Sequence, residues 1–117
     1  MGLSLTLLPL RGPEELCGTR VFCHDQLNFY RDNRIFDQLI YGRIDTQLIP
    51  PQLWIEISGC GEGEKFRTDS YNDGLKFVYA EQLKKLELHH DTAPRNRAIK
   101  AFIDELPNDT PVILLWR

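Results

Sequence analysis

The sequence predicts an α+β fold, in which a mostly antiparallel sheet carries two or three helices packed on one face. Three observations lead to this fold class. Strand-like apolar segments fall at the start, in the middle and at the end of the chain, and amphipathic segments of helical period lie between them. The chain has 117 residues, of which 42% are apolar, so we expect one compact domain over residues 1–117.

A first strand is predicted over residues 3–8, where leucines at alternate positions share one face and Ser4 and Thr6 lie on the other. Pro9 ends this strand. A short second strand is predicted at residues 21–23. Because the helices cover only one face of the sheet, Ser4 and Thr6 are expected to face water.

A first helix is predicted over residues 32–41. Asp32 can accept a backbone hydrogen bond at its N-terminus, and Gly42 provides the backbone freedom that is common just after a helix. The apolar side chains recur at helical spacing and should cover the sheet. They belong to Ile35, Phe36, Leu39 and Ile40.

A middle strand is predicted over residues 53–57, directly after Pro50–Pro51, because apolar residues alternate there. Its other face, which continues to Ser58, is expected to lie in water. Trp54 and Glu56 share that face. An exposed Trp there would be a candidate contact, since Trp residues contribute strongly to binding at interfaces, and burial of Trp54 beneath a second helix is the alternative. We therefore select Trp54 and Glu56 as candidate interaction residues.

A hairpin is predicted from residues 65–67 and 75–79. The connection between them, Asn72–Asp73–Gly74, contains the Asp-Gly pair that favours a tight turn. An acidic, glycine-rich loop over residues 59–64 precedes the hairpin.

Two further helices are predicted, over residues 80–88 and 92–106. Asp91 or Thr92 is expected to cap the second helix, and Pro94 suits its first turn because proline has no N–H to leave unpaired. The apolar stripe of this helix should pack on the sheet. It consists of Ala98, Ile99, Phe102, Ile103 and Leu106.

The chain ends in an apolar run at residues 112–116, after a turn bounded by Pro107 and Pro111. A strand with one exposed face would alternate, and this run does not, so an interior strand is predicted. At a sheet edge the same strand would offer unpaired backbone groups to another chain, which leaves a homodimer or capture of a partner's strand as the alternative.

Charge and hydropathy limit the class of partner. The net charge is −3, from 14 basic and 17 acidic residues, which argues against general binding to nucleic acid. No apolar run approaches the roughly 20 residues that cross a bilayer, and no secretion signal is visible. We expect a soluble, cytoplasmic protein without membrane contact, in which Cys17, Cys23 and Cys60 stay reduced.

Metal binding is not predicted. Cys17 and Cys23 are too far apart for the paired thiolates of a structural zinc site. On a strand, Cys23 and His24 would point to opposite faces. His89–His90–Asp91 lies between two predicted helices, where a solvated linker is expected. We therefore assign no metal ligand and no cofactor.

Cys60 is the best placed nucleophile, because glycine N–H groups on both sides of it could hold an oxyanion. However, Glu62 and Glu64 should raise the pKa of its thiol and suppress the thiolate. The glycines at 59, 61 and 63 also lack the spacing of a phosphate-binding loop. No catalytic residue is assigned.

The remaining candidate interaction residues are basic. Arg95 and Arg97 lie near a predicted helix N-terminus, where the helix dipole disfavours cations. Each of them should therefore have an acidic partner or an anionic ligand. The arginine group consists of Arg31, Arg34, Arg95 and Arg97.

The opening segment 3–10, segment 79–84 and the closing segment from Asn96 to Trp116 resemble small phage- and prophage-encoded proteins. These segments are structural elements, so the resemblance implies an origin and supplies no catalytic residue.

Together these observations predict a small interaction or accessory module that acts on an unknown protein partner. An alternative is a small enzyme or ligand-binding domain that uses Cys60, His24 or the His89–His90 pair. A second alternative is contact with nucleic acid through the arginine group.

Overall fold

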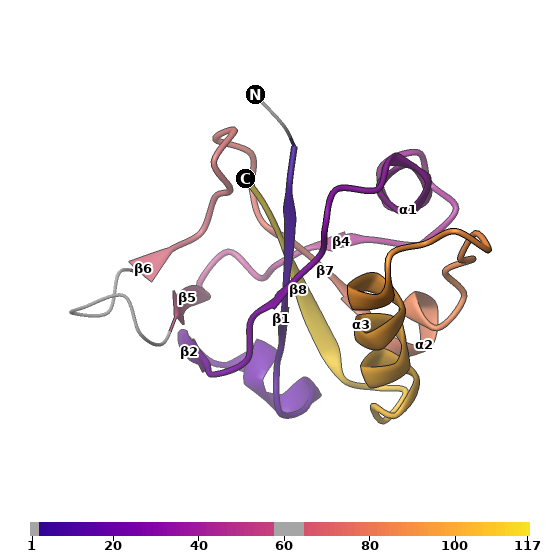
Figure 1. Ribbon diagram of the computed structural model, residues 1–117. Helices are drawn as coiled ribbons and strands as arrows, with labels where there is room; N and C mark the ends of the chain where they lie inside the picture. The colour runs from indigo at the N-terminus through magenta and orange to yellow at the C-terminus, as the bar shows by residue number, and fades with distance from the viewer. Residues whose placement is uncertain (1–2, 58–64) are drawn as a thin grey trace.

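The computed structural model describes residues 3–57 and 65–117 (Figure 1). Its larger sheet has five strands in the order β3-β1-β8-β7-β4, and all of its pairings are antiparallel. The α+β class with a mostly antiparallel sheet is therefore confirmed. The strands are β1 (Leu5–Pro9), β3 (Leu27–Asn28), β4 (Gln47–Leu48), β7 (Lys76–Tyr79) and β8 (Pro111–Trp116).

A second sheet of three strands was not predicted. Its order is β2 (Arg20–Cys23), β5 (Trp54–Ile57) and β6 (Lys65–Phe66). Strand β2 runs parallel to β5, and β6 runs antiparallel to it. The two strands expected at 21–23 and 53–57 thus exist, but they pair with each other and not with the larger sheet.

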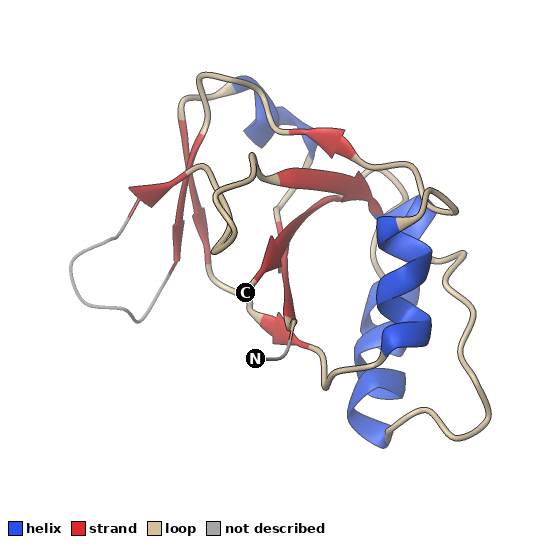
Figure 2. Cartoon of the chain, turned by 90° about the horizontal axis from the view of Figure 1, so that it is seen from above, coloured by secondary structure: helices blue, strands red, loops and turns tan. Residues whose placement is uncertain are grey.

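The molecule has three layers. The helices α1 (Asn33–Ile40), α2 (Ala80–Leu83) and α3 (Pro94–Asp104) cover one side of the larger sheet, and the smaller sheet lies on the opposite side (Figure 2). A short 3-10 helix, η1 (Pro13–Cys17), packs with the smaller sheet. No helix among the described residues is long and apolar enough to cross a membrane.

Strand β8 divides the core. Val112 and Leu114 face the helices, and Ile113 and Leu115 face the smaller sheet. Because both faces are covered, an uninterrupted apolar run is the pattern that burial requires. Strand β8 pairs with β1 on one side and β7 on the other, so the interior strand is confirmed and its edges are not available to another chain.

The smaller sheet also explains a wrong prediction. Thr6 was expected in water, but it is buried, because the smaller sheet covers its face of β1. Its hydroxyl donates to the Asn28 side-chain oxygen on β3. Ser4, just before β1, is exposed as expected, and Ser58 lies outside the described residues.

Helix α1 follows its predicted bounds closely. The Asp32 carboxylate accepts a hydrogen bond from the Arg34 N–H, and Gly42 has a φ of 86°. Ile35, Phe36 and Leu39 are buried. Ile40 was expected with them but is 47% exposed, because it faces a cavity at the end of the sheet and not the sheet itself.

Helix α3 departs from its prediction in two respects. Pro94 opens the first turn as expected, but the residue before it, Ala93, takes the cap position without a side-chain hydrogen bond. The buried stripe is Asn96, Ile99 and Ile103. Phe102 is 42% exposed and Ala98 is also exposed, so the placement of both in the core was wrong. Leu106 is partly buried against the core.

The predicted helix over 80–88 is reduced to the single turn of α2, and the predicted hairpin survives only as its tip. The Leu75 N–H donates to the Arg67 carbonyl, and Asn72 adopts a left-handed φ of 65° in the turn. Beyond this tip the arms separate, because β6 pairs with β5 and β7 pairs with β8 and β4. The turn therefore connects the two sheets.

Two buried amide side chains hold loops against the helices. Gln38 of α1 donates to the Glu87 carbonyl at 2.9 Å and accepts from the Glu87 N–H at 2.9 Å. Asn96 of α3 donates to the Tyr30 carbonyl at 3.0 Å and accepts from the Tyr30 N–H at 2.9 Å. Each amide thus replaces the peptide partner that a strand would supply.

Candidate interaction surface

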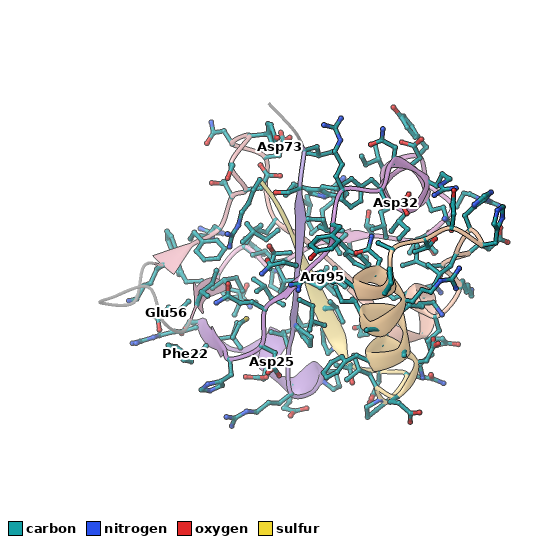
Figure 3. All side chains as sticks on the ribbon, viewed as in Figure 1. Phe22, Asp25, Asp32, Glu56, Asp73 and Arg95 are labelled. Carbon is teal, nitrogen blue, oxygen red and sulfur yellow. The ribbon has the colours of Figure 1, made fainter. Side chains whose placement is uncertain are left out.

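The side of the smaller sheet that points away from the core carries a mixed aromatic and basic surface. Strand alternation turns Val21, Cys23, Ile55 and Ile57 inward, so the intervening residues point outward. We call this surface the outer face. It consists of Arg20 and Phe22 on β2, Trp54 and Glu56 on β5, Lys65 on β6 and the following residue, Arg67. Figure 3 shows Phe22 and Glu56 at this end of the molecule, remote from α3.

Two aromatic rings remain open to solvent on the outer face. Trp54 and Phe22 are each 42% exposed. The Arg67 guanidinium lies over the Trp54 ring, 5.1 Å from its centroid. The His24 ring contacts Phe22 edge-on, at 4.8 Å between centroids. Of the two environments left open for Trp54, exposure is the one observed, and each ring contacts a neighbouring side chain.

Glu56 points to the outer side as expected but is not in water. Only 2% of the residue is exposed, and its carboxylate accepts a hydrogen bond from Arg20 Nε at 2.9 Å. Its burial follows from its position on the central strand, between side chains of β2 and β6. Glu56 therefore anchors Arg20 and is not itself free to contact a partner.

The local charge of the outer face differs from that of the whole chain. Among its described residues, three cations (Arg20, Lys65 and Arg67) surround one carboxylate, which is already paired with Arg20. The chain as a whole carries −3. The described part of this surface is thus locally basic on an acidic protein.

Arg95 and Arg97 lie elsewhere and make structural contacts. Arg95 donates to the Asn28 carbonyl at 2.7 Å and lies 5.2 Å from the centroid of the Tyr30 ring. Arg97 donates to the carbonyls of His89 and Thr92. Backbone carbonyls thus satisfy the two cations for which the sequence suggested acidic partners or an anionic ligand.

Arg34 is paired with Asp91, whose carboxylate lies 2.7 Å from the guanidinium. This hydrogen bond raises the pKa of Arg34 and lowers that of Asp91, to which His89 also donates. Arg31 is exposed, and it lines a surface hollow together with Arg34 and Asn96. The arginine group therefore lies around the starts of α1 and α3. Figure 3 shows Asp32 and Arg95 in this region, away from Glu56.

Two of the three cysteines lie among the described residues. Cys17 and Cys23 are both free thiols. Burial, with smaller contributions from Glu15 and Asp25, raises the pKa of Cys23 to about 12. Cys23 points inward and His24 outward, as the strand pattern predicted. Cys60 lies outside the described residues.

His89, His90 and Asp91 place one potential metal-ligand atom each within 4.8 Å of one another. All three are exposed, and the Asp91 carboxylate already binds Arg34 and His89. A cation would have to displace the guanidinium, so the absence of a metal site stays our prediction.

Three residues of the outer face were not selected from the sequence: Phe22, Lys65 and Arg67. Phe22 and Lys65 lie opposite Glu56 on the neighbouring strands, and Arg67, just after β6, lies over Trp54. The chain matches no family model, no curated protein and no solved structure. Function is therefore argued from this geometry.

Proposed function

We propose that this protein is an interaction module whose outer face binds an acidic segment of a partner protein. The observation that carries the proposal is the pair of half-exposed rings, Trp54 and Phe22, set among three cations. The other exposed aromatic residues, such as Tyr41 beyond α1, lie outside this basic surface.

The rings supply apolar contact area. Aromatic side chains bury about 150–250 Å² each, and burial contributes about 25 cal/mol per Å². Each of the two residues is 42% exposed, and covering that exposed area would contribute about 2 kcal/mol per residue before the costs of association. This contribution is typical of an interface residue that dominates binding.

The cations supply selectivity and are already oriented. Arg20 is held by Glu56, and Arg67 lies over Trp54. Side chains that are ordered before binding lose less conformational entropy when a partner arrives. Their charge favours carboxylates, and it should accelerate association at low salt.

A random peptide library selected on the immobilised full-length chain tests the proposal. We expect the enriched peptides to be acidic and to contain apolar residues. Trp54→Ser and Arg67→Ser should each weaken their binding by about tenfold or more. Tyr41→Ser is the matched control, because it removes an exposed aromatic ring far from the outer face, and it should leave binding unchanged.

Three outcomes would overturn the proposal. They are enrichment of basic or uncharged peptides, equal binding by the Trp54→Ser and Tyr41→Ser variants, and tighter binding of a thymidine oligonucleotide than of any peptide at the same surface. The last outcome would indicate nucleic acid, since stacked bases also use aromatic rings beside cations. We propose a reducing cytoplasm as the setting, and the phage origin stays a prediction.

A further inference from the structure

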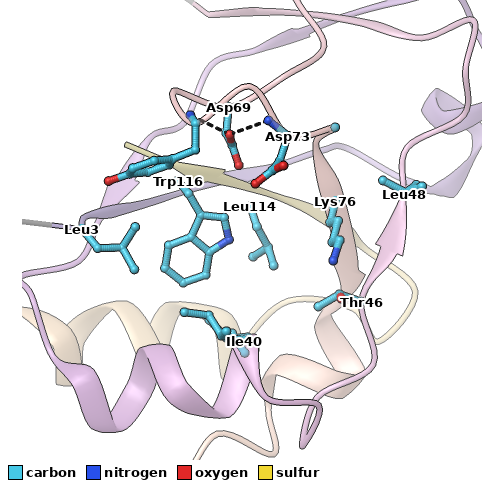
Figure 4. Close-up of a pocket in the computed structure, with 12 residues that line it drawn as sticks. Leu3, Ile40, Thr46, Leu48, Asp69, Asp73, Lys76, Leu114 and Trp116 are labelled. Carbon is cyan, nitrogen blue, oxygen red and sulfur yellow. Dashed lines mark hydrogen bonds between the residues drawn. The ribbon is translucent and has the colours of Figure 1, made fainter.

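A cavity lies at one end of the larger sheet, away from the outer face. It has a volume of about 560 Å³ and lies between α1, strands β4, β7 and β8, and the turn over residues 69–74 (Figure 4). That volume is within the range of small-molecule sites. No residue of the outer face lines it, so it is independent of the proposed function.

One half of this cavity is apolar. Leu114 of β8 lines it beside Trp116, whose ring is held edge-on by Phe36 at 5.3 Å. Ile40 and Leu48 border it and are both exposed. Ile40 belongs to the apolar face of α1, yet it has no apolar partner that buries it. Exposed aliphatic side chains around a hollow are the surface that an apolar ligand would cover.

The other half is polar and carries fixed charge. Asp69 accepts hydrogen bonds from the N–H groups of Tyr71 and Asp73, at 2.8 and 3.1 Å, and these bonds hold the turn (Figure 4). Among the described residues, the Asp73 carboxylate and the Lys76 ammonium group have no hydrogen-bond or ion-pair partner. Two carboxylates and one ammonium group give this lining a net charge of −1.

We propose that this cavity binds a small amphipathic amine, a molecule with an apolar ring system and a primary ammonium group. The ring system would lie against Leu114, Trp116 and Ile40. The ammonium group would pair with Asp73 beside Asp69. A carboxylate ligand of the same shape would meet two carboxylates and one ammonium group, so it should bind more weakly.

Two ligands that share a naphthylethyl group and differ in their charged head group test this assignment: 2-(2-naphthyl)ethylamine and 3-(2-naphthyl)propanoate. Each is titrated into the ¹⁵N-labelled full-length chain and followed by amide and indole chemical shifts. We expect the amine to shift the signals of residues 69–76 and the Trp116 indole, with an affinity about tenfold above that of the acid.

The Asp73→Asn variant should lower the affinity for the amine by about tenfold. Asp109→Asn removes an exposed carboxylate on the turn before β8, outside the cavity, and should have no effect. The proposal is overturned if the acid binds as tightly as the amine, if the amine shifts signals elsewhere, or if Asp73→Asn retains full affinity while its spectrum shows the native fold.

Discussion

Replacing Asn96 by alanine removes only a small side chain, but it should lower the free energy of unfolding substantially. The side chain is buried on α3 and makes two hydrogen bonds to Tyr30, to the N–H at 2.9 Å and to the carbonyl at 3.0 Å. Alanine fills neither role, so both peptide groups lose their partner. A buried polar group left unpaired costs about 1–3 kcal/mol.

Water can reach the exposed side of Tyr30, so we use the lower half of that range for each group. The expected loss in the free energy of unfolding is then about 2–4 kcal/mol. Domains of this size are stable by about 5–15 kcal/mol, so the variant should fold but unfold at a clearly lower urea concentration. An unchanged dependence on urea would show that the unfolded state is the same.

Asn108→Ala is the matched control. Asn108 is exposed, and its side-chain oxygen accepts a hydrogen bond from Lys84 Nζ at 2.6 Å. Loss of an exposed hydrogen bond should cost less than about 1 kcal/mol. If Asn96→Ala is no more destabilising than Asn108→Ala in urea denaturation, the account of Asn96 as the clamp on the loop at Tyr30 is wrong.

Three further predictions concern the core, a thiol and an ion pair. Ile103→Ala should lower the free energy of unfolding by about 2–5 kcal/mol and Phe102→Ala by about 1 kcal/mol, because Ile103 is fully buried and Phe102 is half-exposed; the reverse order in thermal melts would contradict the packing of α3. In a Cys60→Ser background, Ellman's reagent at pH 8 should modify the exposed Cys17 at once and Cys23 only after unfolding. Two thiols that react at once in the folded protein would contradict the burial of Cys23. Since burial raises the pKa of Cys23 from 9.0 to about 12, the free energy of unfolding should also fall as the pH rises from 9 toward 12. Arg20→Ala should cost about 1.5–3 kcal/mol by leaving the Glu56 carboxylate unpaired, and this loss should shrink in the Glu56→Gln background; a double-mutant cycle with no coupling would show that the pair is not stabilising.

Elements with a strong local pattern could be predicted from the sequence. The run at 112–116 is apolar at every position, which identified the central strand β8. Asp32 and Gly42 identified both ends of α1, because capping depends on residues adjacent in sequence. These predictions needed no knowledge of the rest of the chain.

The smaller sheet could not be predicted in this way. Strand β2 pairs in parallel with β5, about thirty residues further along the chain, and nothing local specifies that pairing. Without it, Thr6 and Glu56 read as polar residues on a wet face. The fully satisfied contacts of Gln38 and Asn96 are also long-range, so their burial has no sequence signature.

The candidate surface was predicted only in part. Trp54 was selected because alternation turns it outward, and it is 42% exposed and not buried beneath a helix. Arg67 and Phe22 join it through strand pairing and not through sequence proximity. The arginines near the start of α3 were selected for their charge, but Arg95 and Arg97 bind backbone carbonyls there.

The claim that the outer face is a binding surface has one most direct test. The tightest peptide from the library selection is added to the ¹⁵N-labelled full-length chain, and the amide and indole signals that move are mapped on the structure. The account predicts that the Trp54 indole and the amides of β2 and β5 shift together, and that this shift is lost in Trp54→Ser and kept in Tyr41→Ser. Shifts confined to α1, α3 or the cavity at Trp116, with the Trp54 signals unmoved, would contradict it.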